Sequence, residues 1–144
     1  MTKITDRIRP RWCLGILVVY LGTFSWKGRA ELPFGLIPSP VSVERHDGRF
    51  HFTSNTCVAG EGVAAIEAEK LVDALAPAMG FRMKLVRDPA AENCISLSID
   101  VSARGPLGEE GYELGVYQDK VVIRAAAAAG LFYGIQTLRQ LLPA

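Results

Sequence analysis

The 144-residue sequence predicts a single α+β domain, and two periodicities carry this prediction. Apolar and polar residues alternate over Ile95–Val101 and on both sides of a turn near Asp119, which is the period of half-buried strands. Apolar residues recur at intervals of three and four over Glu61–Met79 and Gly130–Leu142, which is the period of amphipathic helices. Strands and helices of these kinds bury their apolar faces against each other in one core.

The first predicted elements are extended segments that follow a proline-rich lead-in. Val41–Glu44 is expected to form a short edge strand, because the nearby prolines cannot donate hydrogen bonds to a central ladder. Phe50 and Phe52 alternate with polar neighbours, so we expect a half-buried strand that extends from them toward Val58. His51 then faces outward.

The first helix is expected over Glu61–Met79, with its charged residues mostly on the solvent side. Pro77 lacks a backbone donor, so the regular part is expected to end near Ala76. The last turn is expected to close at Gly80, because glycine is the usual residue just after a helix. A strand over residues 83–86 follows.

The second half of the chain predicts a strand, a hairpin and a final helix. Ile95–Val101 is expected to have one wet face, and Ser102–Gly111 is expected to be a loop. The hairpin pairs Tyr112, Leu114 and Val116 with Val121, Ile123 and Ala125. Gly130 and Gly134 lie on adjacent turns of the final helix, although each glycine costs about 1 kcal/mol relative to alanine. They therefore indicate a tight backbone approach to the sheet or to a neighbouring domain.

Residues 1–30 have the order of a secretory signal peptide. Basic residues precede an apolar run at Trp12–Phe24, and Gly28 and Ala30 supply the small side chains that precede a cleavage site. We expect cleavage after Ala30, a secreted or periplasmic product, and no stable membrane span after cleavage. An uncleaved anchor stays open as an alternative, although the run is shorter than the ~20 residues that cross a bilayer.

Length and charge limit what residues 31–144, the expected domain, can do. The first 30 residues hold six of the 16 Lys/Arg and one of the 15 Asp/Glu, which leaves 114 residues with a net charge of −4. This length supports one modest core and is too short to add a catalytic barrel of about 250 residues. The arginines are scattered and form no basic stripe, so nucleic acid is not an expected partner.

Two cysteines remain in this segment, in a compartment that permits disulfides. Cys57 and Cys94 can pair with each other, or both can be small buried hydrophobic residues near the ends of strands. The sequence leaves both alternatives open. Zinc is not expected, because these cysteines and the pair His46 and His51 lack the short ligand spacings of zinc sites. No metal or other cofactor is predicted.

Three segments together resemble a known family. They are Leu36–Pro40 (LIPSP), Glu110–Leu114 (EGYEL) and Gly130–Leu142 (GLFYGIQTLRQLL). The chain from Leu36 to Leu142 resembles the N-terminal non-catalytic domain that precedes the catalytic barrel in the beta-N-acetylhexosaminidases of glycoside hydrolase family 20. The resemblance implies an antiparallel-rich sheet of about four to five strands with two helices packed on one face. A related domain precedes the barrel of family 84 beta-N-acetylglucosaminidases, which is an alternative parent.

The resemblance also implies that the catalytic residues lie elsewhere. In family 20 the substrate's own acetamido oxygen is the nucleophile, and an adjacent Asp-Glu pair on a barrel strand assists it. This chain has no Asp-Glu dipeptide; its closest carboxylate pair, Glu109 and Glu110, lies in a predicted loop. His51 has no nucleophile or ordered acid partner. We therefore predict no catalytic, cofactor-binding or metal residue, and expect the barrel to be missing from this chain.

The function that the resemblance implies is to buttress the barrel of a secreted enzyme that removes terminal N-acetylhexosamine from chitin-type oligosaccharides or glycoconjugates. A stand-alone carbohydrate-binding module is an alternative, which would require an exposed aromatic platform. We expect Tyr112 and Phe132 in the core and Tyr133 in the docking surface. Leu141 and Leu142 lie outside the inward stripe, so the isolated domain is expected to expose apolar surface and aggregate. A truncated product without activity is a further alternative.

Overall fold

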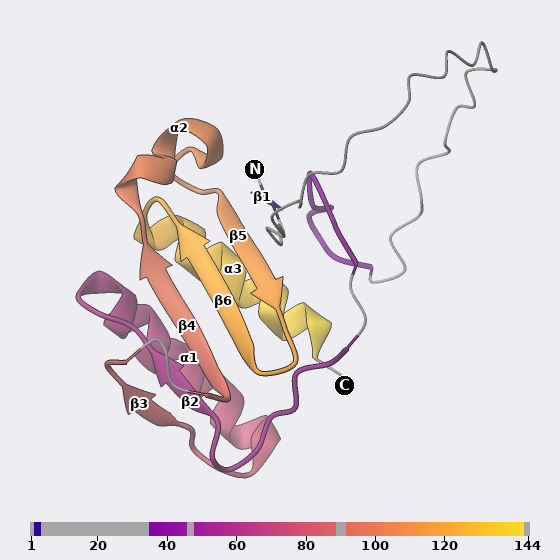
Figure 1. Ribbon diagram of the computed structural model, residues 1–144, viewed down its shortest axis with the longest axis vertical. Coiled ribbons are helices and arrows are strands. Elements are labelled where there is room, and N and C mark those ends of the chain that lie inside the picture. Colours follow the sequence, from indigo (N-terminus) through magenta and orange to yellow (C-terminus); the bar gives the residue numbers. More distant parts are fainter. Residues whose placement is uncertain (1, 4–34, 46–47, 89–91, 143–144) are drawn as a thin grey trace, which may run out of the picture.

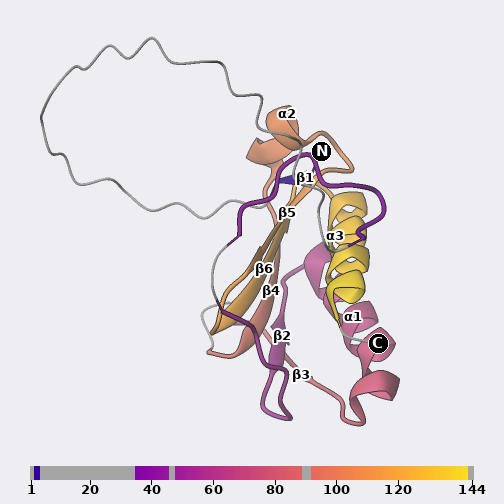
Figure 2. The same ribbon diagram turned by 90° about the vertical axis from the view of Figure 1, so that its right-hand side faces the viewer.

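The computed structural model describes residues 2–3, 35–45, 48–88 and 92–142. It has two layers, a sheet and a pair of long helices that lie on the same face of the sheet (Figure 1 and Figure 2). The helices are α1 (Val63–Met79) and α3 (Ala128–Leu141). The α+β class and the placement of two helices on one face are therefore confirmed.

The sheet has the strand order β1-β5-β6-β4-β2-β3. Its strands are β1 (Thr2–Lys3), β2 (Cys57–Ala59), β3 (Lys84–Val86), β4 (Cys94–Ile99), β5 (Tyr112–Val116) and β6 (Lys120–Ala125). Among these strands only β5 and β6 pair antiparallel, and the other neighbours run parallel. The sheet is therefore mixed, whereas the expected sheet was antiparallel-rich.

The parallel pairs follow from the connections between the strands. α1 crosses one face of the sheet between β2 and β3, and a crossover of this kind returns the chain in the same direction. The chain then places β4 on the other side of β2, and the hairpin places β6 beside β4. Alternation along a strand reports which face is buried but not the direction of the neighbouring strand. The sequence pattern therefore did not reveal this arrangement.

The hairpin between β5 and β6 has the predicted register. The opposed pairs are Tyr112 with Ala125, Leu114 with Ile123, and Val116 with Val121. The Tyr117 N–H donates to the carbonyl of Lys120 at 2.8 Å and closes the turn. The strands predicted from residues 83–86 and 95–101 are also present, as β3 and β4.

One apolar core lies between the helices and the sheet. Its fully buried side chains include Leu71 of α1, Leu131 of α3, and Ile95, Leu114 and Ile123 of the sheet. Each side chain of this size contributes about 1.5–3 kcal/mol when it leaves water. The core therefore fixes both helices on the sheet.

α1 ends at the predicted glycine but continues past the predicted end of its regular part. Gly80 adopts a left-handed conformation with φ 73°, and its N–H donates to the carbonyl of Ala76 at 3.1 Å. The helix extends through Pro77 to Met79. Pro77 lies two residues before the end of the helix, so its missing donor and its ring disturb only the last turn.

The two glycines of α3 lie against the sheet side of the molecule, as the sequence indicated. A Cβ atom on Gly130 would lie 2.4 Å from the carbonyl oxygen of Gly111, which precedes β5. A Cβ atom on Gly134 would lie 2.5 Å from Cγ2 of Ile123. The missing side chains therefore let the helix backbone approach β5 and β6.

Two predicted strands near the start of the domain are absent from residues 35–45 and 48–56. Val41–Glu44 contains one isolated bridge residue, Ser42, and Phe50–Phe52 is extended without a ladder. The Phe50 and Phe52 rings instead form an edge-to-face pair with centroids 5.1 Å apart and pack against the core. The edge strand expected at Val41–Glu44 is not formed. The strand expected from Phe50 toward Val58 forms only at its end, as β2, because alternation indicates half-burial and does not provide a hydrogen-bonded neighbour.

The predicted loop at Ser102–Gly111 contains short helical turns. These are η1 (Val101–Ala103) and α2 (Arg104–Leu107). The Asp100 carboxylate accepts a hydrogen bond from the Ser102 N–H at 2.9 Å and caps the first turn. Aspartate at this position satisfies a backbone donor that would otherwise have no partner.

The predicted signal peptide lies outside the described residues, except for Thr2 and Lys3 of β1, and it stays a prediction. His46, considered above as a zinc ligand, also lies outside them. Within the described ranges, no helix combines the length and the apolar character needed to cross a membrane.

Candidate functional surface

The outer side of the helix layer carries a group of exposed apolar side chains. We call this group the helix patch; it consists of Val63 and Ile66 on α1 and Phe132 and Tyr133 on α3, which are 43 to 56 % exposed. The Phe132 and Tyr133 rings contact each other edge to face with centroids 5.5 Å apart. α1 and α3 lie next to each other on the sheet (Figure 2), so the members of the patch belong to two neighbouring helices.

The position of Phe132 corrects the prediction that this side chain belongs to the core. Leu131, Ile135 and Leu138 turn toward the sheet at intervals of four and three residues. Phe132 follows Leu131 by 100° around the helix, which carries its ring out of that stripe. Tyr133 is exposed as expected.

The C-terminal leucines of α3 are less exposed than the sequence suggested. Leu141 and Leu142 are half-buried and pack against the core. Nearby, the lead-in segment lies against the end of α3, because the Ile37 N–H donates to Oε1 of Gln140 at 2.9 Å and Nε2 of Gln140 donates to the Ile37 carbonyl at 3.0 Å. The outward apolar surface of α3 therefore centres on Phe132 and Tyr133.

A buried carboxylate lies on α1 close to the helix patch. Glu67 is one turn after Val63 on the same side of the helix, and its side chain is nine-tenths buried. Its Oε1 accepts a hydrogen bond from Nζ of Lys70 at 2.7 Å, whereas Oε2 has no hydrogen-bond partner among the described residues. Oε2 is enclosed by the surrounding side chains, so it is a costly buried acceptor inside the domain and not an exposed docking contact.

The opposite face of the sheet has a different chemical character. Arg124 of β6 donates to Oε2 of Glu113 at 3.0 Å and to Oδ2 of Asp100 from Nε at 3.1 Å. The hydrogen bond from the Ser102 side chain, followed by that from Arg124, lowers the pKa of Asp100 to about 2. The same contact with Asp100 raises the pKa of Arg124. The one positive and two negative charges pair with one another on the surface.

The aromatic residues do not gather into one platform. Tyr112 is buried, and its hydroxyl is hydrogen-bonded to Thr137 of α3. Tyr117 lies close over Gly115 on the other face of the sheet, with Nζ of Lys120 5.7 Å from its ring centroid. The exposed aromatic pair among the described residues is therefore Phe132 and Tyr133, which contact each other edge to face.

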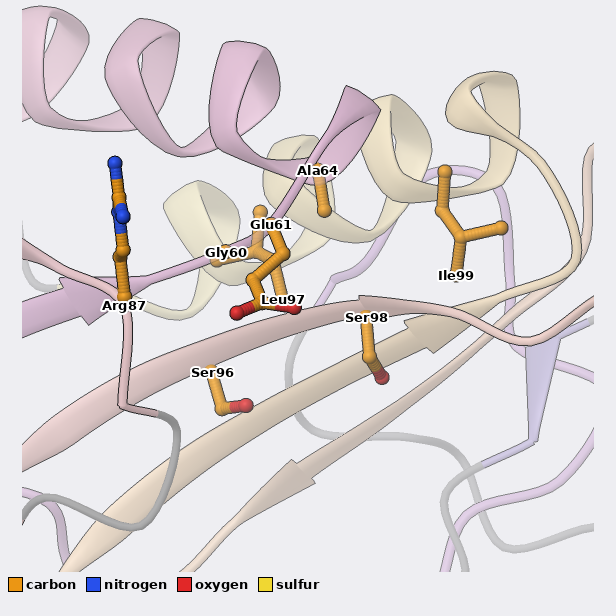
Figure 3. Close-up of a pocket in the computed structure, with 8 residues that line it drawn as sticks. All are labelled: Gly60, Glu61, Ala64, Arg87, Ser96, Leu97, Ser98 and Ile99. Atoms are coloured by element: carbon orange, nitrogen blue, oxygen red, sulfur yellow. The ribbon is translucent and has the colours of Figure 1, made fainter.

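A cavity of about 300 Å³ opens where β2 and β3 end beside the second half of β4 (Figure 3). It is lined by Gly60, Glu61, Ala64, Arg87, Ser96, Leu97, Ser98 and Ile99. Ser96 and Ser98 point away from the helix layer in Figure 3. Neither serine has a histidine beside it in this lining, so the cavity does not assemble an activated nucleophile.

The polar residues singled out from the sequence lie apart from this cavity. His51 is exposed on the extended segment before β2. Glu109 is exposed and lies 3.8 Å from Arg104 in an ion pair, and Glu110 is exposed beside it. None of the three lines the cavity. Among the described residues no three metal-ligating side chains cluster.

The two cysteines lie side by side in the sheet. Cys57 of β2 is directly opposite Cys94 of β4, and both are buried free thiols. Burial, followed by the neighbouring Cys57 thiol, raises the pKa of Cys94 to about 12. Each cysteine is the first residue of its strand, and this is the sequence signal that could have indicated that the two are neighbours.

The described residues define a small two-layer α+β domain whose helix face exposes apolar side chains. The profile of glycosyl hydrolase family 20, domain 2, matches residues 34–144. The chain therefore belongs to glycoside hydrolase family 20, as the N-terminal non-catalytic domain that its sequence resembles.

Individual relatives agree with this assignment. A beta-hexosaminidase of Porphyromonas gingivalis is 35% identical over 112 residues, which are 76% of this chain and 14% of that protein. The Streptomyces plicatus N-acetyl-beta-hexosaminidase is similar with a TM-score of 0.62 and 35% identity, over 78% of this chain and 22% of that chain. The GH20 beta-N-acetylhexosaminidase of Streptomyces coelicolor A3(2) has a TM-score of 0.61 at the same identity and coverage. This chain thus spans less than a quarter of these relatives.

Proposed function

We propose that this domain packs its helix layer against the catalytic barrel of a beta-N-acetylhexosaminidase and supports that barrel without taking part in the chemistry. The observation that carries the proposal is the helix patch, whose four apolar side chains lie exposed on two adjacent helices. Apolar groups gathered in this way are typical of interaction sites. The matched relatives are four or more times longer than the matched segment, which leaves room in them for such a barrel.

The helix face suits this role better than the open face of the sheet. On the open face, Arg124 is already paired with Asp100 and Glu113. Burying those charges would remove their water, which costs more than their pairing returns. On the helix face, the exposed rings of Phe132 and Tyr133 would leave water on docking.

The activity of the whole enzyme is part of the same proposal. The relatives are named beta-hexosaminidases, and one is described in complex with Thio-NAglucal. We infer that the parent of this chain removes terminal N-acetylhexosamine from chitin-type oligosaccharides or glycoconjugates, in a secreted or periplasmic location. The basic and apolar order of residues 1–30 supports that location.

The test uses the Streptomyces plicatus relative with the segment that matches this chain removed. Calorimetry measures binding of this chain to the shortened relative, and a chromogenic N-acetyl-β-glucosaminide measures hydrolysis. We expect binding, no turnover by this chain alone, and at least tenfold weaker binding by the variant Phe132→Ser with Tyr133→Ser. The matched control is Val101→Ser, which removes an apolar side chain that is 72 % exposed in η1 and outside the patch.

Two outcomes would contradict the proposal. Turnover by this chain that persists through further purification would show that it carries chemistry of its own. Binding of an N-acetylglucosamine oligomer to this chain alone, abolished by Phe132→Ser with Tyr133→Ser, would instead favour the carbohydrate-binding module.

A further inference from the structure

Cys57 and Cys94 lie directly opposite each other in the sheet. Two cysteines that only fill space in a core would not need this arrangement. The two residues are direct neighbours across β2 and β4, and their side chains share one face because parallel neighbours in register point the same way. Val58 and Ile95, the next residues on each strand, face the helix-layer core. The cysteines therefore face the other side of the sheet.

Their side chains lie together in one buried cluster. Cys57 and Cys94 form a small buried cluster with Ala59, and Val86 packs against it. Cys57 is 7 % exposed and Cys94 is 1 % exposed. Neighbouring strands lie about 4.7–4.9 Å apart, which is within the 4.4–6.8 Å that separates the Cα atoms of a disulfide. The backbone therefore permits a bond between them.

We propose that Cys57 and Cys94 are an oxidation site and close into a disulfide that joins β2 to β4. The oxidant is a small disulfide such as oxidised glutathione. The Cys57 thiolate attacks one sulfur of this molecule, forms a mixed disulfide and releases one glutathione thiolate. The Cys94 thiolate then attacks the Cys57 sulfur and releases the second. The protein loses two protons and two electrons, and one oxidised glutathione becomes two reduced molecules.

In a domain that is already folded, the order of these steps follows from exposure. Cys57 is the more exposed thiol and meets the oxidant first, and Cys94 resolves the mixed disulfide. Only the thiolate reacts, and the pKa of Cys94 is raised to about 12, so few molecules carry it in the folded domain. The bond therefore forms faster while the chain folds than after the sheet has closed.

The disulfide would enclose the half of the domain that α1 covers. The segment between the two cysteines contains α1 and β3. α1 carries Val63 and Ile66, so oxidation would also hold that half of the helix patch on the sheet. A loop of this length gains stability chiefly because its unfolded state has less conformational entropy. The inference itself is independent of the proposed docking role.

The experiment uses the full chain with Cys13→Ala, so that Cys57 and Cys94 are its remaining thiols. The chain is refolded with oxidised glutathione and then labelled with a maleimide in denaturant. We expect no labelled thiols, full labelling after reduction, and one cross-linked peptide containing both residues. The oxidised domain should melt roughly 10 °C or more above the reduced domain.

Single variants supply the matched controls. With Cys57→Ala or Cys94→Ala, oxidation should give only a glutathione adduct or an intermolecular dimer, without the rise in melting temperature. Free thiols that persist in the chain with both cysteines would overturn the proposal. So would a stable glutathione adduct on each cysteine, or a cross-linked domain that melts no higher than the reduced one.

Discussion

At the scale of single residues, two glycines decide how close α3 lies to the sheet. Glycine lowers helix stability, yet the Gly134 backbone packs where a Cβ atom would lie 2.5 Å from Cγ2 of Ile123 and 3.1 Å from Cδ2 of Tyr112. Both neighbours are buried and held by the hairpin. The close packing of the helix therefore outweighs the propensity of its residues.

Gly134→Ala should lower the free energy of unfolding. The added methyl group must displace Ile123 or Tyr112, and overpacking of this kind costs about 1–3 kcal/mol. The gain in helix propensity is only about 1 kcal/mol. Urea unfolding measures the change, and Gly105→Ala is the control, because a Cβ atom there meets open space. A Gly134→Ala protein as stable as the parent would show that this contact is not tight.

A second effect at this scale concerns the charge of Asp100. Its pKa of about 2 in the folded domain is lower than its ordinary value of 3.8, because Ser102 and Arg124 stabilise the carboxylate. A depressed pKa adds stability that is fully present above the unfolded value and is lost as the pH falls toward the folded value. The contribution is therefore lost between about pH 4 and pH 2.

At pH 7, Asp100→Asn should accordingly lower the melting temperature. This decrease should become smaller as the pH approaches 2. Thermal unfolding of the parent and the variant at pH 7, 4 and 2.5 measures the difference between them. Lys and Arg stay charged over this range. A smaller difference in melting temperature between parent and variant at low pH therefore reports protonation of the Asp100 carboxylate in the parent. A difference that stays constant down to pH 2.5 would contradict the assignment.

At the scale of elements, the sequence predicted what depends on local periodicity. The β5–β6 hairpin and the existence of α1 and α3 follow from alternation and from helical spacing. The parallel neighbours of β2 and β4 depend on where distant segments meet, and no local pattern contains that information. The exposure of Phe132 was missed although the spacing of Leu131, Ile135 and Leu138 already places it outside the buried stripe of the helix.

Pro77→Ala tests the end of α1. Pro77 is exposed and lies inside the helix, where it cannot donate to the carbonyl four residues earlier. Alanine restores that donor and costs no packing, so we expect a gain of roughly 1–2 kcal/mol, below the ~3 kcal/mol of a helix interior. Urea unfolding is the measurement, and Ala78→Gly in the same turn should act in the opposite direction. A destabilised Pro77→Ala domain would mean that proline mainly restricts the unfolded chain.

At the scale of the whole molecule, the two faces of the domain differ in whether their side chains already have partners within the domain. The open sheet face satisfies its own charges through Arg124, Asp100 and Glu113. The helix face leaves Phe132 and Tyr133 in water, and Glu67 has one unpaired oxygen. The sequence could indicate a docking surface through Tyr133. It could not locate the unpaired oxygen of Glu67, which depends on packing between elements.

A domain with this surface should associate with itself when no barrel covers it. We expect the isolated chain to sediment as species that grow with concentration, because apolar side chains leave water when two patches meet. Phe132→Ser with Tyr133→Ser should shift it to a monomer, whereas Val101→Ser should not, although Val101 is the more exposed side chain. Analytical ultracentrifugation over a range of concentrations measures this. If the parent chain stays monomeric throughout, the helix patch is too weak to hold a partner by apolar contact alone.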